Sequence, residues 1–100
     1  MKFDLIIRPE AEQDMLGAFS WYEDRASGLG KEFIRCVDKA LIQINRSPKT
    51  CPALYQGIRR ILTRRFPFGI FYIVVGPKII VLAILHARRD PSMWQKRKPK

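Results

Sequence analysis

Residues 58–85 read IRRILTRRFPFGIFYIVVGPKIIVLAIL, and this stretch sets the architecture of the chain. It contains three runs rich in β-branched and aromatic residues, at 58–65, 70–75 and 79–85, and such residues favour strands. The two short segments between the runs contain Pro and Gly, which favour turns. Strands joined by short turns pair as antiparallel neighbours. The stretch therefore predicts a three-stranded antiparallel meander.

The N-terminal half has the pattern of one strand followed by two helices. Residues 3–7 form a short apolar run typical of a buried strand, and Pro9 stands where the first turn of a helix accepts proline. Gly28 and Gly30 separate two stretches in which apolar residues recur at helical spacing. The apolar residues of the two stripes are Ala11, Met15, Ala18, Phe19, Tyr22 and Ala26, then Phe33, Val37, Ala40, Leu41 and Ile44. A connection this short predicts an antiparallel helical hairpin.

The predicted order of elements is β-α-α-β-β-β. A helical hairpin would cover one face of a small, mostly antiparallel sheet, which is an α+β fold. Residues 48–57 are then the longest loop, and residues 91–100 a basic tail with one helical turn followed by solvated charge. The chain has 100 residues, of which 47% are apolar, a size typical of one domain. We expect residues 1–100 to form a single domain.

Composition excludes several classes of protein. No apolar run reaches the roughly 18–20 residues that span a bilayer, and the N-terminus lacks a signal-peptide core, so we expect a cytoplasmic protein without a membrane partner. Cys36 and Cys51 cannot build a disulfide framework. One histidine and two separated cysteines fall short of a zinc site, and Gly28-x-Gly30 follows a helix, whereas a nucleotide loop follows a strand. We therefore expect neither a metal nor a cofactor.

Charge is divided unevenly along the chain. The net charge is +10, yet residues 1–38 carry eight acidic and five basic side chains, a net −3. Residues 39–100 carry fourteen basic side chains and a single acid, Asp90, a net +13. A surplus concentrated in this way predicts a strong positive potential over one side of the domain. We expect an acidic partner, either a nucleic acid or a protein with acidic segments.

Arginine is concentrated in the second predicted strand and at the end of the last one. A buried unpaired guanidinium is very costly, so at least two of the four arginines in residues 59–65 must reach solvent or an anion. Alternate strands of a sheet lie only about 10 Å apart, so the meander brings this strand close to His86. We expect an arginine-lined, target-binding surface with one imidazole. Its expected residues are Arg59, Arg60, Arg64, Arg65, Arg88, Arg89 and Trp94.

The same surface has a catalytic interpretation, and the residues alone leave it open. His86 could exchange a proton while Arg60 and Arg88 hold a phosphate, as an endoribonuclease requires. Asp90 is the one carboxylate near the histidine in sequence. However, a lone histidine at a strand end is more often a hydrogen-bonded structural residue, and Asp90 could pair with a neighbouring arginine to fix the chain turn.

Two segments carry a resemblance to a known family. Residues 64–72 read RRFPFGIFY, and residues 85–94 read LHARRDPSMW. Together with the order of elements and the basic second half, they resemble the RelE/ParE superfamily of type II toxins, and the ParE side more closely. The resemblance implies a toxin neutralised by a cognate acidic antitoxin that is partly disordered before binding. It also implies a role in plasmid stabilisation.

The resemblance leaves two targets, DNA gyrase for ParE-like members and the ribosome with its mRNA for RelE-like members. The chain departs from the RelE type at Gly69, Leu62 and Trp94, where that type has an arginine, a lysine and a tyrosine. Loss of cationic groups that stabilise a transition state typically costs about 10²–10³ in rate for each group. We therefore expect an inhibitor of DNA gyrase without catalytic residues. The alternatives are a ribosome-dependent endoribonuclease using His86, Arg60 and Arg88, and a non-toxic module that still binds the antitoxin.

Overall fold

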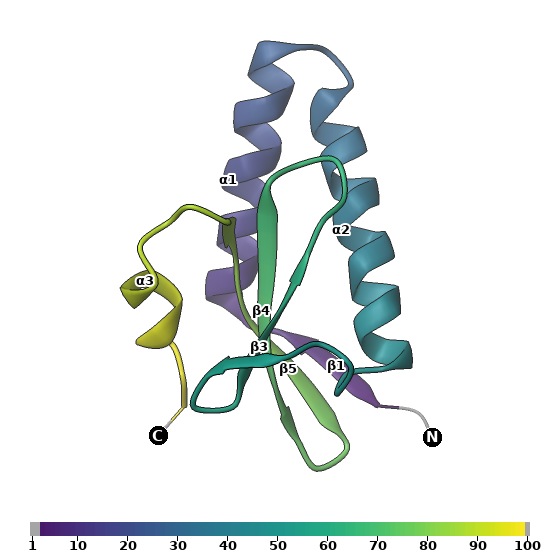
Figure 1. The fold of residues 1–100 in the computed structure, drawn as a ribbon. Coiled ribbons are helices and arrows are strands. Elements are labelled where there is room, and N and C mark those ends of the chain that lie inside the picture. Colours follow the sequence, from purple (N-terminus) through teal and green to yellow (C-terminus); the bar gives the residue numbers. More distant parts are fainter. Residues whose placement is uncertain (1–2, 100) are drawn as a thin grey trace.

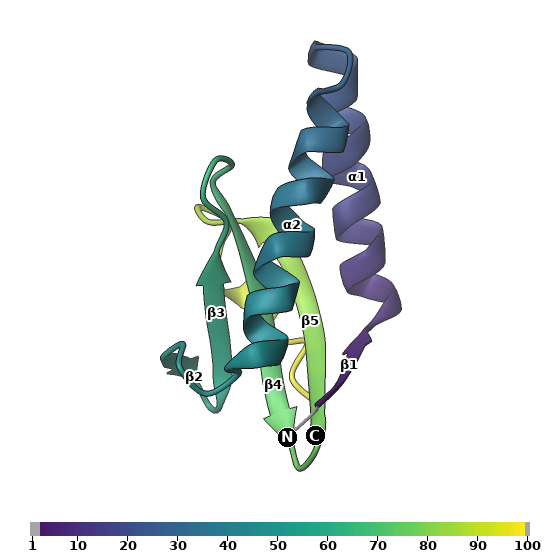
Figure 2. The same ribbon diagram turned by 90° about the vertical axis from the view of Figure 1, so that its right-hand side faces the viewer.

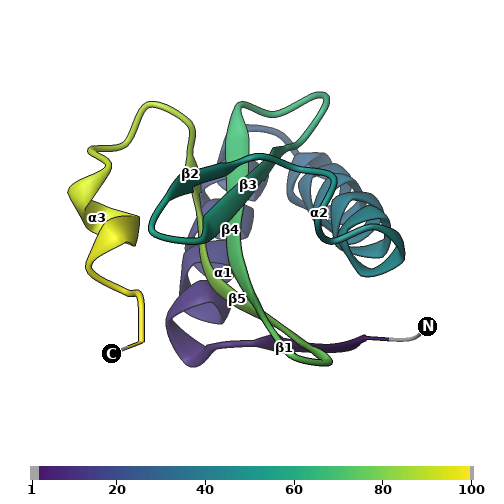
Figure 3. The ribbon, with the colours of Figure 1, turned by 60° about the horizontal axis from the view of Figure 1, so that its bottom comes forward.

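A five-stranded sheet lies between a pair of long helices and one short helix in the computed structural model, which describes residues 3–99 (Figures 1 and 3). This arrangement confirms the predicted α+β class and the helical hairpin. The elements are β1 (Asp4–Ile7), α1 (Pro9–Arg25), α2 (Leu29–Arg46), β2 (Ala53–Tyr55), β3 (Ile58–Leu62), β4 (Phe68–Val75), β5 (Lys78–His86) and α3 (Ser92–Gln95). Among the residues described, no helix combines the length and the apolar character that crossing a membrane requires.

The strands follow the order β1-β5-β4-β3-β2 across the sheet. The β1 strand pairs in parallel with β5, and the three other pairings are antiparallel. The meander of β3, β4 and β5 is thus confirmed, and the sheet is mostly antiparallel as expected. The parallel pairing ends at Ile7 and Val81, so the outer edge of β5 has no neighbouring strand from Leu82 onward.

Two boundaries differ from the prediction. The expected loop at 48–57 contains the short strand β2, which pairs with Ile58 and Arg59. The β3 strand ends at Leu62, and β4 begins at Phe68 where residue 70 was expected. The reason lies in the turn, where the Thr63 N–H donates to the Phe68 carbonyl (2.9 Å) and the Thr63 hydroxyl donates to the Phe66 carbonyl. These bonds close the turn before Phe68, and Phe68 pairs with His86 of β5, so β4 begins at this residue.

The connection between α1 and α2 depends on two glycines and one carboxylate. Gly28 has a φ of +88°, which favours glycine, and a Cβ added at Gly30 would lie 2.7 Å from the Phe19 carbonyl oxygen. The Glu23 carboxylate accepts hydrogen bonds from the N–H groups of Gly28 (2.9 Å) and Gly30 (3.0 Å). The bond from Gly28 is the main cause that lowers the pKa of Glu23. The glycine pair is therefore a tight helical connection, as the sequence indicated.

The sheet is apolar on both faces, so it is covered on both. On one side, Phe33, Val37 and Ile44 of α2 pack against a first core. On the other side, Trp94 of α3 stacks on Phe71, with ring centroids 4.6 Å apart and planes at 17°. The first core also contains Ile61, Ile70, Tyr72, Ile79, Val81 and Ile84, and the second core contains Ile58, Ile73, Leu82, Ala83 and Leu85. Burial on both faces explains why residues 70–75 and 79–85 are apolar without alternation.

The Phe71–Trp94 stack makes the short α3 part of the fold. We predict that Trp94→Ala lowers the free energy of unfolding by about 3–5 kcal/mol, because it leaves a cavity over the sheet. Trp21 is 52% exposed and provides a matched control, so Trp21→Ala should cost about 1 kcal/mol or less. Urea unfolding followed by circular dichroism measures both variants. Equal costs for the two tryptophans would contradict this assignment of the second core.

Candidate functional site

Two of the arginines in residues 59–65 are held within the molecule. The Arg59 guanidinium donates hydrogen bonds to the backbone carbonyls of Lys49 (3.1 Å) and Cys51 (2.5 Å). These bonds tie the segment before β2 to the sheet. Arg65 forms an ion pair with Glu32, near the start of α2. Both guanidinium groups therefore already have partners within the molecule.

Arg60 lies on the face of the sheet opposite the helical hairpin. Along β3, Ile58 belongs to the second core and Ile61 to the first, so the alternation of side chains places Arg60 with Ile58. The aliphatic chain of Arg60 passes over Gly69 of β4, where an added Cβ would lie 3.0 Å from Arg60 Cδ. The absence of a side chain at Gly69 therefore leaves the space that Arg60 occupies.

His86 ends β5 on the face that carries the helical hairpin. Its ring lies 5.7 Å from that of Phe68, and its Nδ1 accepts a hydrogen bond from the Arg88 N–H (3.1 Å). That bond leaves Nε2 as the nitrogen available for other contacts. The Asp90 carboxylate accepts from the Ser92 N–H (3.0 Å), and within residues 3–99 it forms no ion pair with an arginine. The sheet therefore separates His86 from Arg60.

The expectation of one arginine-lined surface on the sheet is wrong. Both faces of β4 and β5 are apolar and covered, so cations reach solvent only at the rims of the molecule. Trp94, expected to contact a target, is buried in the second core with 6% of its surface exposed. Of the predicted residues, those that are exposed are Arg64, Arg65, Arg88 and Arg89, and Arg65 among them is paired with Glu32. The structure brings His86 and Arg89 to one hollow and places Arg64 beside α2.

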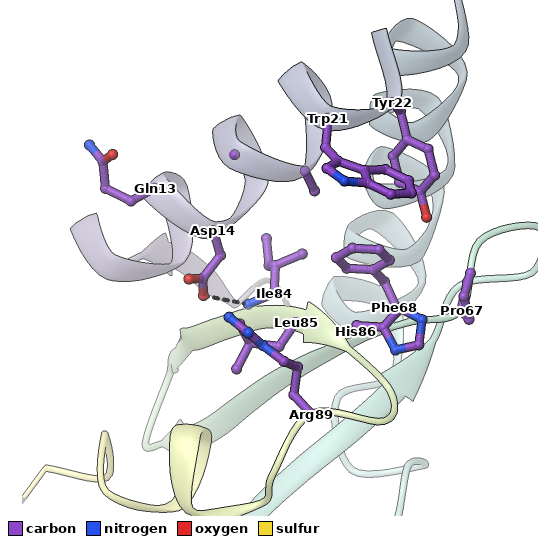
Figure 4. Close-up of a pocket in the computed structure, with 12 residues that line it drawn as sticks. Gln13, Asp14, Trp21, Tyr22, Pro67, Phe68, Ile84, Leu85, His86 and Arg89 are labelled. Atoms are coloured by element: carbon purple, nitrogen blue, oxygen red, sulfur yellow. Dashed lines mark hydrogen bonds between the residues drawn. The ribbon is translucent and has the colours of Figure 1, made fainter. Parts of the chain in front are cut away.

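A hollow of about 690 Å³ lies between α1 and the ends of β4 and β5 (Figure 4). Figure 4 shows the rings of Trp21, Tyr22 and Phe68 at one end, with Asp14 and Arg89 toward the other. Its lining is mostly apolar. Burial raises the pKa of Tyr22. A hollow of this kind is suited to apolar side chains of a partner rather than to phosphate. We name it the α1 hollow.

A buried ion pair joins the C-terminal tail to this region. The Arg97 guanidinium donates to the Asp14 carboxylate (2.5 and 3.3 Å) and to the Leu82 carbonyl (3.1 Å), while Asp14 also accepts from the Ile84 N–H (3.1 Å). These backbone groups belong to the outer edge of β5 beyond the end of β1. Asp14 and Arg97 therefore occupy part of a strand edge that would otherwise be open to another chain.

The sequence analysis missed this pair and expected the tail at 96–100 to be solvated charge. The prediction is wrong for Arg97, and Lys100 lies outside the described residues. Asp14 and Arg97 are separated by 83 positions, so no local pattern links them. One signal was present, because Asp14 is an acid on the apolar stripe of α1, three residues after Ala11 and four before Ala18.

We predict that Asp14→Ala and Arg97→Gln each lower the free energy of unfolding by about 1–3 kcal/mol. Each substitution leaves a largely buried partner with unsatisfied hydrogen bonds. The double variant should cost less than the sum of the two, since the pair acts as one unit. Urea unfolding of the four proteins in the cycle measures this. Arg88→Gln, at an exposed site, is the control, and additive costs would contradict the pairing.

The described part of the chain holds no group of three His, Cys, Asp or Glu side chains that could bind a metal ion. The polar groups near His86 are likewise engaged in structural contacts, because Asp14 binds Arg97 and Asp90 binds the Ser92 N–H. The geometry thus offers two kinds of binding surface. One is the α1 hollow, and the other is the exposed charge of Arg64, Arg88 and Arg89.

Comparison with known proteins agrees with the architecture. Residues 5–91 match the model of the ParE toxin family of type II toxin-antitoxin systems, parDE. None of the curated protein sequences matches the chain.

Solved structures share the fold at low identity. A chain of the chromosomal ParDE system of P. aeruginosa is 19% identical with a TM-score of 0.64, covering 85% of this chain and 96% of that one. A mutant E. coli RelE toxin in the free state is 16% identical with a TM-score of 0.66, covering 99% and 100%. A chain of the M. tuberculosis RelBE2 toxin-antitoxin complex is 14% identical with a TM-score of 0.57, covering 86% and 99%.

Proposed function

The chain belongs to the ParE toxin family of type II toxin-antitoxin systems, and on that premise we propose that it inhibits DNA gyrase by binding. A cognate acidic antitoxin would neutralise it. Gyrase works on chromosomal DNA, so the site of action would be the cytoplasm. The observation that carries the choice of target is the separation of His86 from Arg60 by the sheet.

The separation bears on catalysis because phosphoryl transfer needs its acid, base and cations around one phosphate. The Arg60 side chain lies on the face of the sheet that carries Trp94, whereas His86 lies on the face that carries α1. At Gly69, where the RelE type has an arginine, a Cβ would already lie 3.0–3.1 Å from atoms of Arg60 and Phe71. An arginine at this position would therefore require its neighbours to shift.

A ribosome-dependent endoribonuclease is the second candidate function. It is favoured by the free Nε2 of His86 and by the exposed arginines at 88 and 89 that follow it. A non-toxic module that retains antitoxin binding is the third, and it would share the α1 hollow with the first two. The three candidates differ in what the protein does to gyrase, to mRNA and to growth.

The α1 hollow is the proposed docking place of the antitoxin. Two of the similar solved structures are described as toxin-antitoxin complexes, which supports a partner of this class for this chain. Trp21 and Phe68 offer apolar surface, and Arg89 places a cation at the hollow. An amphipathic acidic segment would bury its apolar side chains against the rings and pair its carboxylates with the arginine, ordering as it binds.

We predict that the purified protein inhibits gyrase supercoiling at micromolar concentration and that His86→Ala inhibits it equally. The imidazole has no role in inhibition by binding, whereas a nuclease would lose its proton-transfer group. Agarose-gel supercoiling assays and primer extension on translated mRNA are run on both proteins. Ribosomal A-site cleavage that His86→Ala abolishes, without gyrase inhibition by either protein, would transfer the assignment to the endoribonuclease. Tight antitoxin binding with no growth arrest would favour the non-toxic module.

We also predict that Trp21→Ala weakens binding of the proposed cognate acidic antitoxin by at least about tenfold, because buried tryptophans dominate interfaces. Isothermal titration calorimetry measures the affinity. Val75 is 53% exposed at the far end of β4, so Val75→Ala is a matched control that should leave the affinity unchanged. An unchanged affinity for Trp21→Ala would place the antitoxin elsewhere.

A further inference from the structure

The outer side of α2 forms a flank of the molecule that neither α1 nor α3 covers (Figures 2 and 3). On this flank, a groove runs between α2 and the end of β3. It consists of two adjoining hollows of about 520 and 310 Å³, which share Lys39, Gln43 and Arg64. The first is also lined by Arg46 at the end of α2 and by residues that follow it, and the second by Leu62 at the end of β3 and by Thr63. We name it the α2 groove.

The groove exists because β2 is short. The β2 strand pairs only with Ile58 and Arg59, so the outer edge of β3 from Arg60 onward has no neighbouring strand. The chain turns back at residues 63–67 into β4, on the other side of β3, and adds no strand to this edge. Arg64, which lies in this turn, reaches the same groove as the side chains of α2.

Charge in the α2 groove is of one sign. Lys39, Arg46 and Arg64 line it, all three are exposed, and within residues 3–99 none of them forms an ion pair. No aspartate or glutamate lines either hollow, and the nearest acid on α2, Asp38, faces solvent outside them. This contrasts with Arg65, whose charge is paired with Glu32. Three uncompensated cations around one concave surface attract a polyanion.

From this arrangement we infer that the α2 groove binds the phosphate backbone of DNA. The inference rests on the proposed function, since it assigns to the toxin a contact with the DNA on which gyrase acts. Lys39 and Arg46 of the groove lie two helical turns apart on one side of α2, about 10 Å along its axis. A duplex strand offers a phosphate about every 3.4 Å of its axis, so several fall within this length.

The lining suits phosphate better than it suits a peptide. Phosphate oxygens only accept hydrogen bonds, and Gln43, Ser47 and Thr50 add an amide and two hydroxyl donors to the cations. The groove has no aromatic side chain in its lining, whereas the α1 hollow has three. A peptide with apolar anchors is therefore accommodated at the α1 hollow, and the two surfaces lie on different flanks of the hairpin.

The test compares two triple variants of equal charge. Lys39→Gln/Arg46→Gln/Arg64→Gln removes the groove cations, and Lys31→Gln/Lys78→Gln/Lys96→Gln removes three exposed cations elsewhere. The probe is a fluorescent 20-base-pair duplex of mixed sequence, and anisotropy is measured over a series of NaCl concentrations. The groove variant should bind at least tenfold more weakly, with a salt slope shallower by about 2–3, since each phosphate contact contributes about 0.9. The control variant should change affinity less than threefold.

Three outcomes overturn the inference. Equal losses for the two variants would mean a general attraction to net charge, and absence of binding by the unmodified protein at 50 mM salt would mean no site. Displacement of the duplex by a stoichiometric amount of poly-glutamate would assign the groove to an acidic peptide. Circular dichroism confirms that both variants are folded.

The inference and the proposed function fail separately. If the duplex binds at the groove but the protein does not inhibit gyrase, the proposed function is wrong and the DNA-binding site still holds. If the groove variant inhibits gyrase as strongly as the unmodified protein, the inference that the groove contacts the DNA on which gyrase acts is wrong, and the proposed function still holds. If both hold, the groove variant needs at least about tenfold more protein to inhibit supercoiling, and the control variant does not.

Discussion

The antiparallel pair of β4 and β5 places the other elements, because its side chains are buried on both faces. Ile70 and Ile84 point into the first core, and Phe71 and Leu85 into the second. A shift of register at Phe71 and Tyr72 leaves Leu82 unpaired, so Leu82 and Ala83 both face the second core. Apolar surface on both sides requires two covers, and the helical hairpin supplies one. The C-terminal segment with Trp94 supplies the other, which is why a tail rich in charge is part of the fold.

A sheet covered on both faces decides where charge can lie. Arg59 of β3 reaches backbone carbonyls, and Arg65 in the connection after β3 reaches Glu32. Free charge is left at the rims, at the turn after β5 and along α2. The apolar α1 hollow and the cationic α2 groove are consequences of the same arrangement. They result from two short strands, β1 and β2, that leave the edges of β5 and β3 only partly paired.

Local patterns predicted the elements and several of their roles. The helical connection at Gly28 and Gly30 and the meander are confirmed. The Tyr72 hydroxyl donates to the Pro48 carbonyl (2.7 Å). Burial is the main cause that raises the pKa of this tyrosine. The errors concern the missed strand β2, the boundaries of β3 and β4, and the partners of charged side chains. The distribution of charge along the chain indicated a basic half, but counting arginines does not reveal which of them have acceptors nearby.

Periodicity and turn residues in the amino-acid sequence determined the α+β class, the helical hairpin and the β3–β4–β5 meander, since these depend on contacts between near neighbours. The tertiary structure alone decided that Arg60 and His86 lie on opposite faces, because the direction of each side chain depends on the register of three strands. It alone decided that Arg97 meets Asp14, since their contact arises only after the sheet, α1 and the tail have packed together. Hydrogen bonds between distant residues have no signature in local spacing, and they determine which charges remain free to bind a partner.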